Sequence, residues 1–148
     1  MERTLILIKP DGVKRRLVGE IIKRFEKKGM RILGMKMLML SKEKAEKHYA
    51  VHKGKPFYSD LVNYITSGPI IAVLLEGNRC IEVTRQMCGS TDGSKAQPGT
   101  IRGDYSLSIE KNIIHASDSK ESFDYEYPIF FSKEEILGFE YGDEMNII

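Results

Sequence analysis

The chain has 148 residues, of which 41% are hydrophobic and 30% are charged, the composition of a globular protein with one domain over 1–148. Its 23 basic and 21 acidic residues leave a net charge of +2, which excludes the strong field expected of a protein that binds nucleic acid or anionic membranes by charge alone. No run approaches the ~18 apolar residues that span a bilayer, and the start does not resemble a signal peptide, so we expect a cytoplasmic protein.

The first part of the chain alternates strand and helix patterns. A branched apolar run at 4–9 predicts a central strand that stops at a Pro-Asp-Gly turn. Residues 17–29 repeat apolar side chains at helical spacing, with Gly29 as the stop. Residues 30–40 predict a second strand, and a helix is expected over 42–52 with a serine cap.

The middle of the chain continues this alternation as far as a long loop. Residues 58–65 predict a short helix, 70–76 a third buried strand, and a further helix is expected from Gly77 to about Cys88. The thirteen residues of 89–101 have a turn-rich composition without periodicity, and loops of this length in compact domains are usually functional or disordered.

The two cysteines, Cys80 and Cys88, fall in that expected helix. Eight helical residues separate them by about 12 Å, beyond the ~7 Å reach of a disulfide. We therefore expect buried thiols in a reducing compartment.

The last predicted elements complete a recognisable order. Residues 111–116 predict a fourth strand, 118–126 a helix, and 132–135 a short helix with a capping box, after which the tail from about 138 is irregular. The order predicts an α+β fold, a ferredoxin-like βαββαβ sandwich whose four-stranded antiparallel sheet carries helices on one face. Because this fold hosts many functions, function has to be argued from a site.

His115 is the sharpest candidate for chemistry. It ends the apolar strand in "NIIHASDS", where small residues leave room around the ring. It is either a core histidine satisfied by hydrogen bonds or a nucleophile whose second nitrogen is held by an acceptor. Polar groups that could serve it follow closely, at Ser117, Asp118, Ser119, Glu121 and Glu126.

The other two histidines, His48 and His52, are four residues apart on an expected helix. This spacing suits a metal, but no third histidine or paired carboxylate is spaced to match. We expect an exposed helix face here.

Three cations stand at the ends of expected elements, namely Lys9, Arg85 and Arg102. They are either solvated surface groups or, if the fold brings them to one opening, ligands for a polyphosphate. Neither glycine-rich phosphate motif is present, so a nucleotide would be held by side chains. Of Phe57 and Tyr58, one should face the core and the other could stack on a base.

Several long stretches resemble the nucleoside diphosphate kinases. They are "TLILIKPDGVKRRLVGEII", "HYAVHKGKPFY", "SGPIIAVLLEG", "PGTIRGDY" and "NIIHASDS", and together they cover nearly the whole chain. The resemblance implies the ferredoxin-like fold and a reversible ping-pong transfer of the γ-phosphate from a nucleoside triphosphate, chiefly ATP, to nucleoside diphosphates. It implies Mg²⁺ as cofactor, carried on the nucleotide phosphates and not bound directly by the protein.

The resemblance also implies roles for single residues. His115 would be phosphorylated, Glu126 would bond its far nitrogen, and Ser117 matches the serine that follows. Tyr49 would line the site beside the histidine. Nucleotide-binding positions match Lys9, Phe57, Arg85, Thr91, Arg102 and Asn112.

Within that set the resemblance divides the nucleotide. Phe57 would stack on the base, and Lys9 and Asn112 would reach the sugar, Lys9 also lying close to the phosphates. The phosphates would be held by Arg85, Thr91 and Arg102. Arg102 is expected to face solvent in a loop, so that its loss would leave folding intact.

Three departures from the family pattern concern small regions. Ala116 stands where glycine is common, and the loop at 91–94 reads Thr-Asp-Gly-Ser without the usual proline. In the family this loop lies at trimer contacts, so the missing proline is expected to lower the stability of the oligomer. A homo-oligomer is expected, with hexamer as first choice and tetramer as second. The tail 139–148 lacks the terminal Tyr-Glu of many members. The expected partners are ATP, GTP and other nucleoside tri- and diphosphates, without a membrane or specific nucleic acid.

Two other functions fit parts of the pattern. An RNA-recognition module would want interleaved aromatics on a strand, and in "RGDYSLSI" Asp104 occupies the aromatic position. A non-catalytic nucleotide-sensing oligomer would keep the cations and Phe57 without needing a reactive His115.

Overall fold

The structure is a computed structural model, and it describes residues 1–139. The expected irregular tail beyond Phe139, with its missing Tyr-Glu, lies outside the described residues. Within the described part, no helix is long and apolar enough to cross a membrane.

Four strands form one antiparallel sheet in the order β2-β3-β1-β4. Their bounds are Glu2–Ile8 for β1, Arg31–Leu38 for β2, Ile70–Gly77 for β3 and Ile114–Ala116 for β4. The two central strands, β1 and β3, pair along their whole lengths, from Glu2 opposite Gly77 to Ile8 opposite Ile71. The predicted α+β ferredoxin-like class is therefore confirmed.

The helices are α1 (Pro10–Lys14), α2 (Val18–Lys28), α3 (Lys42–His48), α4 (Tyr58–Ile65), α5 (Cys80–Cys88), α6 (Ile101–Tyr105) and α7 (Lys120–Phe130), with 3₁₀ turns at Ala50–His52, Gly93–Lys95 and Lys133–Glu135. Gly29 ends α2 at a left-handed φ of 102°, as predicted. The short helices α1 and α6 were not predicted. Each begins on a sequence feature, Pro10 at the first turn of α1 and the Thr100 side chain as the cap of α6.

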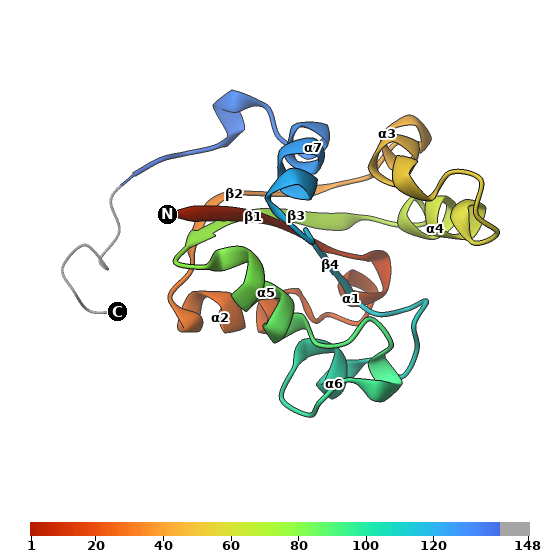
Figure 1. Ribbon diagram of the computed structural model, residues 1–148, viewed down its shortest axis with the longest axis horizontal. Helices are drawn as coiled ribbons and strands as arrows, with labels where there is room; N and C mark the ends of the chain where they lie inside the picture. Colours follow the sequence, from red (N-terminus) through yellow and green to blue (C-terminus); the bar gives the residue numbers. More distant parts are fainter. Residues whose placement is uncertain (140–148) are drawn as a thin grey trace.

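The layers differ from the prediction in one respect, because helices cover both faces of the sheet. In Figure 1, α3, α4 and α7 lie on one side of the sheet, and α2 and α5 lie on the other. Leu5 and Leu7 of β1 pack into the first core, whereas Ile6 and Ile8 pack into the second. Alternate residues of one strand therefore serve two cores, which is why the central strands are apolar without interruption.

The cysteines lie where expected, at the two ends of α5, and both are free and buried. Burial raises the pKa of each thiol to about 11. They are therefore protonated, unreactive core groups at neutral pH.

Candidate active site

The edge strand β4 is entered through a strained residue. Ile113 has φ of 74°, a left-handed conformation that a β-branched residue rarely adopts. Its backbone is fixed on both sides, since its N–H donates to Asp11 Oδ2 at 3.0 Å and its carbonyl accepts from the Lys9 N–H at 2.7 Å. The strand therefore starts at Ile114 and not at 111, and it turns Asn112 and His115 toward the end of β1. The sequence indicated Asp11 only as a turn residue.

His115 lies on β4 opposite Leu7 and is held from α7. Its Nε2 is 2.8 Å from Glu126 Oε1, and the Ser117 hydroxyl donates to the same oxygen at 2.9 Å. The contact expected between His115 and Glu126 is therefore present. The His115 side chain is 21% exposed, so the ring reaches solvent, and the nitrogen that Glu126 does not hold is Nδ1.

The sequence predicted that His48 lies on an exposed helix face, and this prediction is wrong. It is buried, and its ring centroid is 4.6 Å from that of His115 at an interplanar angle of 85°. Among the described residues neither of its ring nitrogens has a hydrogen-bond partner. Burial, with smaller contributions from His115 and Lys9, lowers the His48 pKa well below 6.5, so the ring is neutral at pH 7.

Tyr49 follows His48 at the end of α3 and is buried beside it, at 4.7 Å between ring centroids. Burial, and then the Glu126 carboxylate, raise the Tyr49 pKa above its usual value of 10. Tyr49 thus contacts the ring of His48, which in turn contacts that of His115, and its expected role in lining the site stays a prediction. His52, one turn further on, is partly exposed and lies 5.3 Å from the ring of Phe57.

A chain of polar contacts links the first strand to the long loop. Lys9 Nζ donates to Asn112 Oδ1 at 2.8 Å, and Asn112 Nδ2 donates to the carbonyl of Thr91 at 2.9 Å. Burial and the nearby Arg102 charge lower the Lys9 pKa from 10.5 to about 8. Three of the predicted nucleotide-binding residues, Lys9, Asn112 and the backbone of Thr91, are thus linked to one another.

Arg102 is buried on α6, so the expectation of a solvent-facing loop residue is wrong. Its guanidinium donates to three carbonyls, those of Asn112 at 3.3 Å, Gly89 at 2.8 Å and Ile114 at 2.6 Å. It therefore ties the end of α5 to the entry of β4. Burial lowers the pKa of Arg102 from its usual value, but the group stays charged at any physiological pH.

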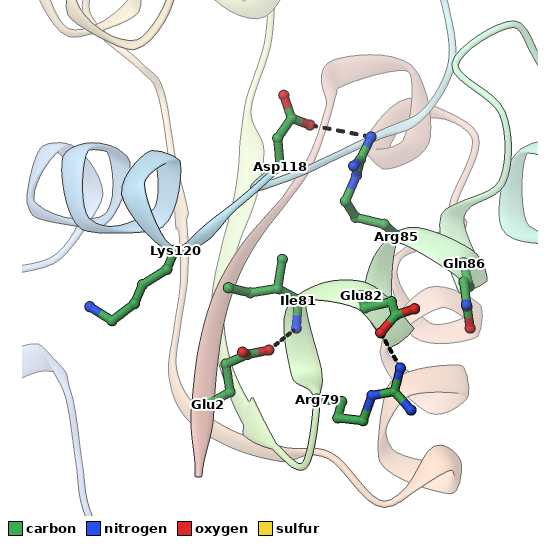
Figure 2. A pocket seen from close by; sticks show the side chains of 8 residues that line it. All are labelled: Glu2, Arg79, Ile81, Glu82, Arg85, Gln86, Asp118 and Lys120. Carbon is green, nitrogen blue, oxygen red and sulfur yellow. Dashed lines mark hydrogen bonds and ion pairs between the residues drawn. The ribbon is translucent and has the colours of Figure 1, made fainter.

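Arg85 and Phe57 lie at the exposed rim. Arg85, on α5, places Nη2 3.6 Å from Asp118 Oδ1, across the upper end of the depression drawn in Figure 2. That depression has mixed charge and is not lined by His115. Phe57 is 46% exposed at the start of α4, whereas Tyr58 packs against the core, which confirms the expected division of the two aromatics.

His115 is thus partly exposed and held by a buried carboxylate, and two buried cations, Lys9 and Arg102, contact residues 112–114 just before it. Phosphoryl transfer depends on groups of this kind to position phosphate and neutralise its charge, so the site fits a phosphotransferase. Comparison with known proteins gives the same class. The family model described as nucleoside diphosphate kinase matches residues 2–136. The chain therefore belongs to the nucleoside diphosphate kinase family, and it is a phosphotransferase.

Relatives and solved structures agree over almost the full length. The chain is 65% identical to the nucleoside diphosphate kinase of Thermoplasma volcanium over 145 residues, which cover 98% of this chain and 99% of that protein. It is 64% identical to that of Hyperthermus butylicus over 138 residues, covering 93% and 97%.

Two solved structures show the same fold with nucleotides bound. A halophilic nucleoside diphosphate kinase from Halobacterium salinarum in complex with CDP has a TM-score of 0.96 at 40% identity, covering 99% of this chain and 98% of that one. A transition-state mimic of the Borrelia burgdorferi enzyme with vanadate and ADP has a TM-score of 0.92 at 36% identity, covering 98% and 95%.

Proposed function

We propose that His115 carries the phosphoryl group in this reversible transfer of a γ-phosphate from a nucleoside triphosphate to a nucleoside diphosphate. The observation that supports it is the bond between Glu126 and Nε2. It leaves the lone pair on Nδ1 to attack the γ-phosphorus, while the bond to the bridging oxygen breaks and the diphosphate leaves. A second diphosphate then attacks phosphorus, and the P–N bond breaks. No separate base is needed, because the ring attacks as neutral imidazole.

The nucleotide is proposed to lie between the buried cations and the exposed rim. Lys9 and Asn112 would bind the sugar and the adjoining phosphates, where their mutual contact already fixes both side chains. Arg85, Thr91 and the N–H groups that Arg102 does not use internally would bind the phosphates. Phe57 would stack on the base. The CDP and ADP complexes of the two relatives support a site that tolerates different bases.

Mg²⁺ is proposed to arrive with the nucleotide as part of the substrate. Mg²⁺ prefers six oxygen ligands, whereas the one histidine-rich group found among the described residues, His48 with His115 and Glu126, offers a single carboxylate. The ion would instead bridge phosphate oxygens and neutralise their charge.

A homo-oligomer is proposed from an apolar edge. β2 lies at one edge of the sheet, and Met35, Met37 and Met39 are each more than half exposed there or just beyond it. An apolar edge strand is a site for pairing with another chain. Hexamer remains the first choice and tetramer the second. We also propose that the protein is located in the cytoplasm, because its two buried thiols are free. A single domain over 1–148 is proposed because the family model matches residues 2–136.

The test is to incubate the full-length protein with γ-labelled ATP and Mg²⁺. We expect an acid-labile, base-stable label that GDP discharges as labelled GTP. His115→Gln should abolish the label, whereas the matched change His52→Gln should keep it. A labelled His115→Gln protein would overturn the proposal, and so would a wild-type protein that binds ATP without becoming labelled, which is the behaviour of a nucleotide sensor.

A further inference from the structure

Three side chains of types that bind metals, one of them the His115 ring itself, converge from three elements. His48 ends α3, His115 lies on β4 and Glu126 lies on α7, and one ligand atom from each is within 4.8 Å of the others. The proposed reaction uses His115 and Glu126 but gives no task to His48. Yet His48 is only 5% exposed, and both of its ring nitrogens lack a partner among the described residues.

An unpartnered imidazole in the core has a physical cost. Burying a polar group without a hydrogen bond costs on the order of 1–3 kcal/mol, so buried ring nitrogens are normally paired. Instead, the His48 ring contacts the His115 ring edge to face, and its centroid is 5.4 Å from that of the Phe130 ring. A ligand that accepts a nitrogen lone pair would satisfy one of its two nitrogens.

We propose that His48, His115 and Glu126 form a site for a divalent transition-metal ion of the zinc type, and that the bound ion inhibits phosphotransfer. Two imidazole nitrogens and one carboxylate oxygen are a ligand set that Zn²⁺ prefers, with a fourth position left for water. The Mg²⁺ of the nucleotide does not compete, because it prefers oxygen ligands in an octahedron. The inhibition, though not the binding, rests on the proposed function of His115.

The distances are compatible with coordination after small side-chain rotations. Zinc–ligand bonds of ~2.0–2.1 Å place two ligand atoms about 3.4 Å apart in a tetrahedron and about 4.2 Å apart at most. The span of 4.8 Å has to close by about 1.4 Å to reach the tetrahedral separation. One pair is already closer, since His115 Nε2 and Glu126 Oε1 are 2.8 Å apart, and the His115 side chain is 21% exposed.

Coordination would disable the nucleophile in two ways. The metal takes a lone pair of the His115 ring, which withdraws electron density from both nitrogens. It also recruits the Glu126 carboxylate, so the hydrogen bond that holds the ring is lost, and a proton displaced from nitrogen leaves to solvent.

The direct test is a titration of metal-free, full-length protein with Co²⁺ as a spectroscopic probe and then with Zn²⁺. We expect the visible absorption bands of four-coordinate Co²⁺ at one ion per chain, displaced by Zn²⁺. His48→Phe, which removes the nitrogens and keeps an aromatic ring, should weaken binding by more than roughly tenfold. Glu126→Gln should also weaken binding of the ion. Because it preserves the side-chain volume, it serves as the test variant if His48→Phe folds poorly. The matched control is His52→Phe, which should bind as the wild type does.

Activity gives the second measurement. With Mg²⁺–ATP in excess, Zn²⁺ should suppress phosphohistidine formation in the wild type, and EDTA should restore it. His48→Phe, compared with its own metal-free rate, should need more than roughly ten times as much Zn²⁺. The proposal is overturned if Co²⁺ gives no such bands, if His52→Phe weakens binding as much as His48→Phe does, or if bound Zn²⁺ leaves labelling unchanged. A failure of His115 phosphorylation itself would show separately, as an unlabelled metal-free protein.

Discussion

Glu126 Oε1 lies 2.8 Å from His115 Nε2 and also accepts a hydrogen bond from Ser117. One buried carboxylate oxygen thus serves two partners, and the pair of contacts fixes both the ring's orientation and its tautomer. The proton is held on Nε2 and the lone pair is left on Nδ1. The strained backbone at Ile113 delivers the ring to this position, because the strand begins only after it.

The Glu126–His115 contact predicts a loss of rate without a loss of nucleotide affinity. Glu126→Gln should slow phosphorylation of His115 by roughly 10- to 100-fold, the range found where a carboxylate orients a metal-binding imidazole. Single-turnover labelling with γ-labelled ATP measures the rate, and ADP binding measures the affinity. Ser117→Ala is the matched control, since it removes the second partner of the same oxygen and should slow the step less. Equal rates in wild type and Glu126→Gln would contradict the positioning role.

The buried guanidinium of Arg102 predicts a loss of stability. Arg102→Ala leaves the carbonyls of Gly89, Asn112 and Ile114 without their donor, and each such buried group costs roughly 1–3 kcal/mol. We therefore expect the free energy of unfolding to fall by about 3 kcal/mol or more, measured by urea denaturation.

Arg85→Ala is the matched control for that change. Arg85 is exposed and its ion pair with Asp118 spans 3.6 Å, so the variant should lose less than about 1 kcal/mol of stability. It should still lose phosphotransfer if Arg85 binds phosphate. A stable Arg102→Ala protein would show that neighbouring groups replace the guanidinium.

The low pKa of Lys9 predicts opposite pH trends for activity and stability. In the folded free enzyme Lys9 loses its proton near pH 8, so kcat/KM should fall as pH rises through 8 and the positive charge for phosphate disappears. The unfolded chain keeps that proton to about pH 10.5, so the unfolded state binds more protons between these values. The free energy of unfolding therefore gains a contribution of about 3 kcal/mol as pH rises from 8 to 10.5.

Lys9→Met separates this contribution from those of other groups. Urea denaturation of wild type and Lys9→Met at pH 7.5 and pH 10 should show that the variant lacks the gain. A wild-type kcat/KM that stays flat to pH 9.5 would contradict the assignment.

The sequence was sufficient for the elements with strong periodicity and for the pairing of His115 with Glu126 through the family resemblance. The second helical layer was not predicted, although the sequence carries a signal for it. The uninterrupted apolar runs of β1 and β3 indicate strands that are buried on both faces of the sheet.

His48 and Arg102 could not be placed from the sequence, for physical reasons. Helix α3 reads KEKAEKH, in which Ala45 is the one apolar residue, so the helix gives almost no phase for deciding that His48 faces the core. Arg102 lies in a five-residue helix too short for periodicity, and its partners Asn112 and Ile114 are ten or more residues away. In both cases the side chain is buried by tertiary contacts, which cannot be inferred from the local sequence pattern.

The exposure of Phe57 predicts a binding effect that is shared by all bases. Phe57→Ala should weaken nucleotide binding by roughly 5- to 160-fold, because one stacked base is worth about 1–3 kcal/mol. Equilibrium binding of ADP, GDP and CDP should show similar losses for each. Folding should be unaffected, since the ring is 46% exposed. The control is Phe57→Tyr, which keeps the aromatic face and should bind nearly as well, and a loss confined to one base would point to specific recognition instead of stacking.

The methionines on the edge strand predict a charge-sensitive assembly. Met37 is 60% exposed on β2, between Met35 at 55% and Met39 at 62%, and a lysine there would place charge in any contact that covers this edge. Met37→Lys should shift sedimentation in analytical ultracentrifugation toward smaller species. Lys53→Met, which alters an exposed site away from the sheet edge, should sediment as the wild type does. Because Met37 contributes little to either described core, the circular dichroism spectrum should be unchanged, so a smaller species would report lost assembly and not unfolding. An unchanged sedimentation coefficient in Met37→Lys would move the subunit contact to another surface.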